Sequence, residues 1–264
     1  MRVDHRQKGN YRVSEAHKPA LSVILPAYNE EQNIPIIVAR LEETFHRCNL
    51  SGEVVLVNDG STDRSQEVML ELTKSLPNIT VVSYNENRGK LTALRCGCLR
   101  ASGEVIVMMD TDLQCRPEEI TWLLSPLEQG YDVVNGWRDY KSYQTTRTMF
   151  SKLYNILVRV IFGVPVHDSN CGFKAWRREV SHNDSHIFDY GLPLIIPYLA
   201  VRGYKIAEVK VSLEKRKYGE SKYYREGALL GGSRNITDLI KGVISLLRLL
   251  SHRRRLRNEG REFV

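Results

Sequence analysis

Two aspartates, Asp110 and Asp112, stand one residue apart at the end of the apolar run Val105–Met109. Such a run predicts a strand buried inside a parallel sheet, and two unpaired charges place the aspartates beyond its carboxyl end. Carboxylates there suit a hard divalent cation, which would bind phosphate oxygens in turn. The alternative is a solvated turn in which an aspartate caps the next helix. The rest of the chain decides between the two.

The residues before this run alternate between apolar strands and amphipathic helices. Strands are predicted over Leu21–Leu25, where Pro26 ends the first, and over Val54–Val57 and Ile79–Tyr84. This alternation predicts a doubly wound parallel sheet, whose right-handed crossovers bring the carboxyl ends of the strands to one edge. Ligands of open α/β sheets bind at that edge. The polar residues expected to converge there are Tyr28, Glu30, Asp59, Asp63, Lys90, Asp110 and Asp112.

The second half of the chain has a looser pattern. The expected elements are a helix beginning at Arg116–Glu119, a strand over Tyr131–Gly136, a helix over Thr145–Phe162, a polar loop over His167–Lys174, a strand over Lys205–Leu213 and an apolar segment over Ile236–Leu250. We expect three regions: a flexible arm over 1–19, one folded domain over 20–232, and an amphipathic, membrane-proximal helix with a basic tail over 233–264.

The composition limits the possible partners. The net charge is +7 and the pI is near 9.1, which favours acidic partners such as nucleotides, lipid phosphates or nucleic acid. Five cysteines, without paired metal-site spacing, indicate free thiols in a reducing compartment. The polar, basic start does not resemble a signal peptide, and no apolar segment is long enough to span a bilayer. A nucleic-acid-binding module is disfavoured, because the basic segments carry no recognised motif.

Several residue sets match one family in the same order. Pro26–Glu30, Asn58–Asp63, Asn87–Lys90 and Asp110–Asp112 resemble the inverting GT-A glycosyltransferases of family 2. Sets in the second half resemble more narrowly the polyprenyl-phosphate sugar transferases, such as dolichol-phosphate mannose synthase and its glucosyl relatives. These sets are Arg147 with Ser151, Cys171–Lys174 and Arg216–Tyr223. The resemblance covers nearly all of Leu21–Leu250.

The resemblance implies a fold and a donor site. The fold would be a GT-A, Rossmann-like α/β domain: a mostly parallel sheet flanked by helices, followed by a C-terminal amphipathic helix. The nucleotide base and ribose would lie against Pro26, Tyr28, Glu30 and Asp59, with Lys90 near the donor phosphates. A Mg or Mn ion bridging the diphosphate would be held by Asp110, Asp112 and Gln114.

The resemblance also implies an acceptor and a location. Arg138, Arg147 and Ser151 would bind the phosphate of a polyprenyl or dolichyl phosphate, while Arg216 and Lys222 would add positive charge from a mobile segment. The donor would be a nucleotide sugar. The enzyme would work as a peripheral protein at the cytoplasmic face of a membrane, with a small membrane-anchor subunit as a partner and no nucleic acid.

Transfer to a phosphate needs little acid–base help. A phosphate monoester is already ionised near neutral pH, because its second pKa is about 6. The groups expected at the reacting atoms are Asp112 and Arg138, and Asp168 is either a helper base or a residue that orders its loop. His182 and His186 are expected on a surface loop rather than at a metal, because the residues between them break a helix.

Two questions stay open at this level. Leu91 and Asn58 depart from the common family pattern, so both GDP-mannose and UDP-glucose are candidate donors. The acceptor could instead be a polysaccharide or a soluble molecule. Such an enzyme would need a true general base, and it would not need Arg147 and Ser151.

Overall fold

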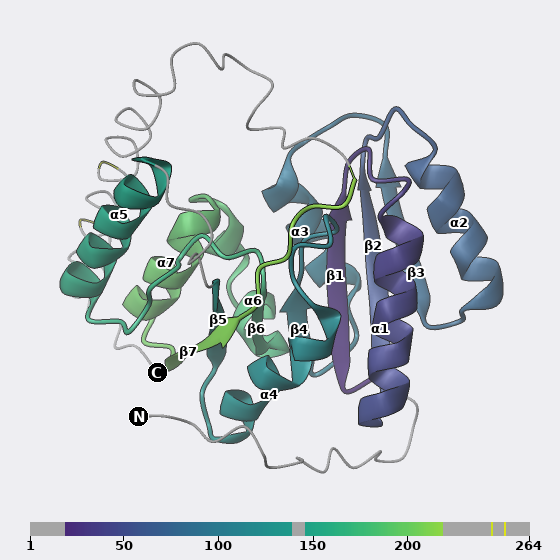
Figure 1. Ribbon diagram of the computed structural model, residues 1–264. Helices are drawn as coiled ribbons and strands as arrows, with labels where there is room; N and C mark the ends of the chain where they lie inside the picture. The colour runs from purple at the N-terminus through teal and green to yellow at the C-terminus, as the bar shows by residue number, and fades with distance from the viewer. Residues whose placement is uncertain (1–18, 139–145, 219–243, 245–250, 252–264) are drawn as a thin grey trace.

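The computed structural model describes residues 19–138 and 146–218, together with residues 244 and 251 (Figure 1). The strands are β1 (Leu21–Ala27), β2 (Gly52–Asp59), β3 (Ile79–Tyr84), β4 (Val105–Met108), β5 (Val133–Arg138), β6 (Lys174–Arg177) and β7 (Ile206–Val211). The α-helices are α1 (Ile34–Cys48), α2 (Ser65–Ser75), α3 (Lys90–Arg100), α4 (Ile120–Glu128), α5 (Thr146–Phe162), α6 (Arg178–His182) and α7 (Ile195–Val201). Short 3-10 helices cover Pro117–Glu119, Ser185–Phe188 and Leu192–Leu194.

The described strands form one sheet in the order β3-β2-β1-β4-β6-β5-β7. Strands β1 to β4 pair in parallel, as do β5 and β7, whereas β6 pairs antiparallel with both β4 and β5. The predicted mostly parallel α/β architecture is therefore confirmed. The reversed strand β6 brings its first residue, Lys174, to the edge at which the other strands end.

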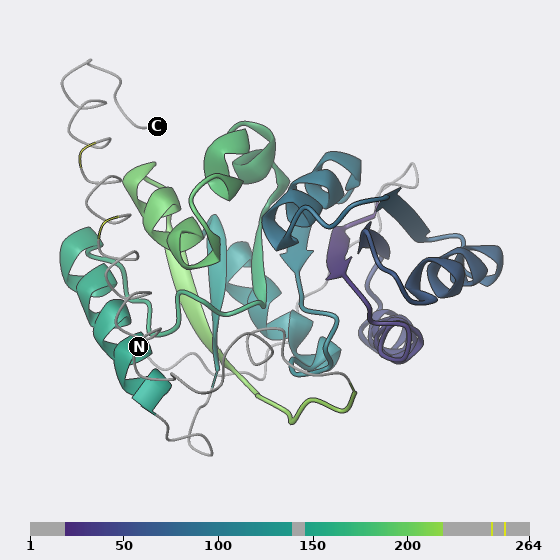
Figure 2. The ribbon, with the colours of Figure 1, turned by 90° about the horizontal axis from the view of Figure 1, so that it is seen from above.

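Helices cover both faces of the sheet (Figure 2). Helices α1, α2 and α4 pack on one face, with Ile37, Met69 and Leu123 fully buried in a shared cluster. Helices α3, α5, α6 and α7 pack on the other, around buried residues such as Leu94 and Trp176. Burial of these apolar faces on a two-sided sheet is the main source of stability, at roughly 25 cal/mol per Å² of apolar surface.

The first four strands were predicted, but their limits differ. Strand β1 continues through Pro26 to Ala27, whereas we expected Pro26 to end it. The prolyl ring is tolerated because β4 pairs only as far as Met108, opposite Ile24, so Pro26 pairs with β2 alone. Strands β2 and β5 also run two residues further than predicted, to Asp59 and Arg138.

The strand β6 was not predicted. Its four residues carry a basic residue at each end, Lys174 and Arg177, which hides the strand in the sequence. The N-terminal arm and the apolar segment over 236–250 lie outside the described residues apart from Pro19 and Ile244. Within the described part of the chain, no helix is both long and apolar enough to cross a membrane.

Candidate functional site

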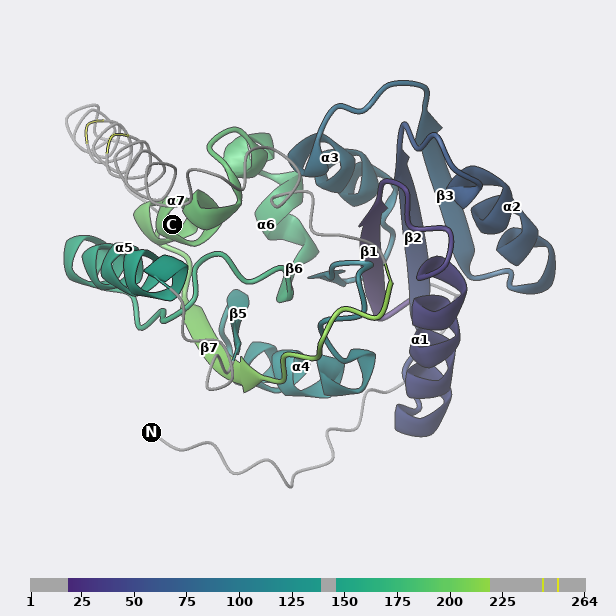
Figure 3. The same ribbon diagram turned by 45° about the horizontal axis from the view of Figure 1, so that its top comes forward.

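The candidate site lies at the carboxyl edge of β1, β2 and β4. After β7 the chain runs along this edge toward β1 (Figure 3). We call residues 212–218 of this segment the strap. Its Glu214 amide donates to the carbonyl of Gln114 at 2.8 Å, and its Arg216 reaches Asp112. The predicted acidic pair and the predicted basic segment are thus side by side.

Among the residues predicted to bind the nucleotide, Asp59 has the best-defined contacts. It is 4% exposed and ends β2, and its Oδ1 accepts hydrogen bonds from the Tyr84 hydroxyl at 2.7 Å and the Arg88 amide at 2.8 Å. Burial and the Asp59 carboxylate raise the pKa of Tyr84, so its hydroxyl stays a donor at neutral pH. The Arg88 guanidinium lies over the Tyr84 ring, 5.4 Å from its centroid. These contacts fix the carboxylate.

The loop after β1 packs on the loop after β2. The Glu30 amide donates to the hydroxyl of Ser65 at 2.8 Å, and the Glu30 carboxylate accepts from the Asn33 amide group at 2.6 Å. The Pro26 carbonyl accepts from the Thr111 hydroxyl at 2.9 Å, which ties β1 to the acidic loop. Tyr28 is half-buried beside them. Asp63 joins the same two loops, because its carboxylate accepts from the Glu31 amide at 3.3 Å and from the amide of Ser65, at the start of α2, at 2.9 Å.

The Asp110 carboxylate accepts from the Lys90 ammonium, which begins α3. Gly172, in the loop before β6, also lies against Asp110. A Cβ at Gly172 would lie 2.1 Å from Asp110 Oδ2, so only glycine allows this approach. The loop after β4 and the loop before β6 therefore meet at Asp110.

Asp112 is 7% exposed and accepts from Arg216 at 2.6 Å. Burial and the nearby Asp110 charge raise the pKa of Asp112, while Arg216, the Gln114 amide and Lys90 oppose that shift. The ionised form of Asp112 is thus destabilised unless positive charge lies nearby. Gln114 lies next to the strap, with its side-chain amide 3.5 Å from the Glu214 carbonyl.

The oxygen atoms of Asp110 and Asp112 are suitable ligands for a hard divalent cation. Asp110 and Asp112 are close enough for one charge to shift the other's pKa. Among the described residues, no group of three or more His, Cys, Asp and Glu could hold a metal by itself. A Mg-type site of one or two carboxylates completed by substrate phosphates and water is consistent with both findings.

Arg138, which was predicted to bind the acceptor phosphate, ends β5 and forms a bidentate pair with Asp168. Its Nε and Nη2 lie 2.7 and 3.0 Å from the two carboxylate oxygens, and Nη2 also donates to the Asn170 carbonyl at 3.1 Å. Asp168 is 1% exposed. Since both its oxygens hold Arg138, Asp168 is suited to order the loop rather than to accept a proton.

Three predicted acceptor residues cannot be placed in the same detail. Arg147 and Ser151 lie in the first turns of α5, and their side chains are outside the described part of the chain, as is all of Lys222. His182 and His186 are on the surface, and His186 pairs with Asp189 at 2.7 Å.

Sequence reasoning missed several residues that shape the site. Tyr84 stands opposite Asp59 in the parallel register of β2 and β3, a contact that strand pairing alone would have indicated. Gly172 belongs to one of the sets that carry the resemblance, but its contact with Asp110 could not be predicted, and neither could the contacts of Glu214, because both depend on loops that meet only in the fold.

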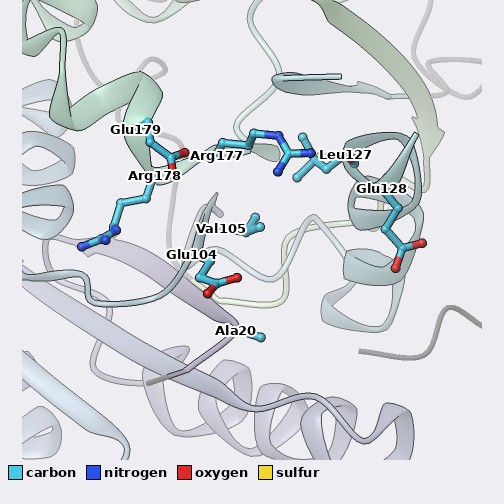
Figure 4. A pocket seen from close by; sticks show the side chains of 8 residues that line it. All are labelled: Ala20, Glu104, Val105, Leu127, Glu128, Arg177, Arg178 and Glu179. Atoms are coloured by element: carbon cyan, nitrogen blue, oxygen red, sulfur yellow. Dashed lines mark hydrogen bonds between the residues drawn. The ribbon is translucent and has the colours of Figure 1, made fainter. Parts of the chain in front are cut away.

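A cavity of about 380 Å³ lies elsewhere (Figure 4). It is lined by residues at the start of β1 and β4 and the end of β6, among them Ala20, Val105 and Arg177. These positions belong to the amino edge of the parallel strands, so this cavity is separate from the candidate site.

The sequence model described as "Glycosyl transferase family 2" matches residues 22–184. Two curated relatives, from Pectobacterium carotovorum and Pseudomonas paraeruginosa, are both named undecaprenyl-phosphate 4-deoxy-4-formamido-L-arabinose transferase. They are 34% and 35% identical over 205 and 207 residues, in each case 77% of this chain. The matches span only 62% and 60% of the relatives' own lengths.

Solved structures share the fold. Mannosyl-3-phosphoglycerate synthase from Rubrobacter xylanophilus aligns with a TM-score of 0.63 at 18% identity, covering 92% of this chain and 76% of its own. Glucosyl-3-phosphoglycerate synthase from Mycobacterium tuberculosis, crystallised with Mn²⁺, UDP and phosphoglyceric acid, aligns with a TM-score of 0.61 at 20% identity, covering 86% and 78%.

Proposed function

Since this chain belongs to glycosyl transferase family 2, we propose that it transfers a sugar from a nucleotide sugar to a polyprenyl phosphate and inverts the anomeric centre. The observation that carries the proposal is the pair of carboxylates at the carboxyl edge, each against a cation from another part of the chain: Lys90 on Asp110 and Arg216 on Asp112. Such an arrangement suits a substrate that brings a diphosphate and its own metal.

The acidic pair would hold a Mg or Mn ion, with Gln114 beside it. The ion would neutralise the charge that builds on the departing nucleoside diphosphate. A solved neighbour crystallised with Mn²⁺ and UDP supports the assignment. Lys90 and Arg216 already lie at this edge, paired with the two aspartates. When the metal occupies the aspartates, these two cations would shift toward the phosphates.

On the other side, Arg138 would bind the acceptor phosphate. The Arg138 guanidinium keeps its positive charge at neutral pH and would attract the phosphate oxygens, while Asp168 fixes its plane through Nε and Nη2. Arg147, Ser151 and Lys222 would complete this subsite. The acceptor phosphate is itself an ionised nucleophile, so Asp168 has no proton to remove.

The names of the relatives support undecaprenyl phosphate as the acceptor. They also bear on the sugar. The resemblance to mannose and glucose synthases implied a hexose, whereas these relatives are named for a substituted arabinose, a pentose. We propose that the donor is a nucleotide-activated pentose of this kind, with GDP-mannose and UDP-glucose as the comparison donors.

The protein would act at the cytoplasmic surface of a membrane, where a polyprenyl phosphate presents its headgroup. The net charge of +7 favours an anionic leaflet. A small membrane-anchor subunit would be a further partner.

Replacing Asp112 tests the proposal. Asp112→Ala is expected to lower sugar transfer to undecaprenyl phosphate in detergent by roughly 10²–10³-fold, the usual cost of losing one group that stabilises developing charge. Asp189→Ala, an exposed aspartate paired with Arg95 and His186, is the control and should transfer normally.

Acceptor choice is tested by competition. Undecaprenyl phosphate and a water-soluble phosphate acceptor, supplied together, should yield mainly the lipid product. Full activity of Asp112→Ala would refute the metal-assisted mechanism, and a preference for the soluble acceptor would favour the rival assignment.

A further inference from the structure

A buried polar row crosses three strands behind the acceptor side. Asn135 of β5 stands between Lys174 of β6 and Glu208 of β7, each in direct register with it. Lys174 and Asn135 are 0% exposed, and the Glu208 side chain is 5% exposed. We call these three residues the rung.

The rung links a buried cation to a buried anion through an amide. The Lys174 ammonium donates to Asn135 Oδ1, and Asn135 Nδ2 donates to Glu208 Oε1 at 2.9 Å. Asn135 cannot turn its amide around without opposing like groups at both ends. The two charges are thereby held at opposite ends of a fixed row.

The side chain of each residue in the rung forms a hydrogen bond with the backbone of residues 167–169. Glu208 accepts from the amides of His167 at 2.8 Å and Asp168 at 3.2 Å. Asn135 Nδ2 donates to the Asp168 carbonyl at 3.0 Å, and the Lys174 ammonium donates to the Ser169 carbonyl at 3.1 Å.

Asp168 lies in the middle of this held segment. Its carboxylate grips the Arg138 guanidinium with two hydrogen bonds. Fixing the backbone on both sides of Asp168 therefore fixes the plane of Arg138. Stability alone does not call for such a row, since well-packed apolar residues often replace a buried ion pair without loss.

We propose that Lys174, Asn135 and Glu208 are positioning residues that hold Asp168, and through it Arg138, in the geometry that receives the acceptor phosphate. The assignment of Arg138 to the acceptor rests on the proposed function. The rung binds the backbone of residues 167–169, so its loss should weaken binding of the acceptor and leave binding of the donor unchanged.

The electrostatics agree with the geometry. Burial lowers the pKa of Lys174 to about 8, while the nearby Cys171, Asp168 and Glu208 oppose this shift and Arg138 adds to it. Burial likewise raises the pKa of Glu208, against the hydrogen bonds from His167, Asp168 and Asn135. Each charge is thus tolerated only through its partners in and around the rung.

Steady-state transfer kinetics test the positioning role. Glu208→Gln, which keeps the shape and removes the charge, is expected to raise the KM for undecaprenyl phosphate at least tenfold and to leave the donor KM within twofold. Lys174→Met should do the same, and Lys205→Met, at an exposed lysine before β7, should change neither value. Equal changes in both KM values, or none, would overturn the proposal.

Hydrogen exchange tests the rung without any activity. In Glu208→Gln, the amides of His167 and Asp168 should exchange at least tenfold faster than in the wild type, while those of β1 and β2 keep their rates. Uniform acceleration would mean that the rung only stabilises the fold, which contradicts the proposal. If the wild type transfers no sugar, the proposed function fails and the exchange result still decides the role of the rung. If Lys174→Met does not fold, Glu208→Gln carries the test.

Discussion

Each residue of the acidic pair already has a cationic partner, and this shapes what a metal must do. Lys90 contacts Asp110 and Arg216 contacts Asp112. A divalent ion would have to displace both side chains, which a diphosphate can compensate by offering them new oxygens. Metal and nucleotide should therefore bind together much more tightly than either does alone.

Lys174 gives a prediction about pH. Its pKa is lowered from 10.5 to about 8 in the folded protein. Between these pH values the unfolded chain therefore binds more protons than the folded protein. As a result, the contribution of Lys174 to the free energy of unfolding rises with pH over this range. The slope of the free energy of unfolding over this range should be greater in the wild type than in Lys174→Met, by at most about 1.4 kcal/mol per pH unit.

Urea unfolding of the two proteins at several pH values between 8 and 10.5 measures this difference. Lys205→Met serves as the control and should keep the wild-type slope, because Lys205 is exposed. Parallel curves for wild type and Lys174→Met would show that Lys174 titrates as an ordinary lysine.

For single residues, the sequence predicted which side chains lie at the site better than it predicted the contacts between them. Asp59, Asp110 and Asp112 were placed at one edge because each follows a buried strand. The pairing of Arg138 with Asp168 was not predicted, since 30 residues separate them and the loop geometry is not encoded locally. Lys174 was assigned to a polar loop, although it begins a strand and is fully buried.

Among the elements, the strap is anchored by contacts with several parts of the chain. Its Glu214 pairs with Arg116 at 2.6 Å and Arg40 at 3.5 Å, and the Ser212 amide donates to Glu119 at 2.8 Å. These contacts come from α1 and from the segment between β4 and α4. These side chains do not belong to the proposed chemistry, and they hold the strap in addition to its contacts with Asp112 and Gln114.

Removing the Glu214 carboxylate should loosen the strap. In Glu214→Ala, trypsin is expected to cut after Lys215, Arg216 or Lys217 several times faster than in the wild type, because both arginine contacts are lost. Mass spectrometry of the early fragments measures these rates. Glu71→Ala, which removes an exposed ion pair on α2, is the control, and equal cleavage rates in all three proteins would rule out the anchoring role.

Predictability also differed between elements. Strands β1 to β4 were found because each is an apolar run followed by a helix of clear period. Strand β6 has four residues, and α7 contains Pro197 and follows Pro193, so neither has a distinctive pattern. Their positions depend on long-range packing against β4, β5 and α5.

Across the whole molecule, different strands of the sheet carry the residues assigned to the two proposed substrates. Strands β1, β2 and β4 carry the residues assigned to the donor, while β5 and the loop before β6 carry Arg138 and Asp168. The two groups meet where Gly172 packs on Asp110. Binding of the donor should thus stabilise the whole domain rather than one loop.

A thermal-shift experiment tests this. A nucleoside diphosphate with Mn²⁺, at about a hundredfold excess over its dissociation constant, should stabilise the protein by about 2.7 kcal/mol. For a domain of this size that corresponds to roughly 5–10 °C in Tm. Comparing GDP with UDP identifies the base, and Asp112→Ala should lose the Mn²⁺-dependent part. An unchanged Tm with every nucleotide would contradict a donor site at this edge.

The reversed direction of β6 has an evolutionary consequence. The loop over 163–173 arrives at the working edge through the beginning of a strand, whereas the donor loops leave it from strand ends. An insertion or deletion in this loop can therefore reshape the acceptor side while the pairing of β1 with β2 and β4 stays intact. If the proposed function holds, a scaffold built this way would allow a lineage to change the molecule that is modified without changing the one that supplies the sugar.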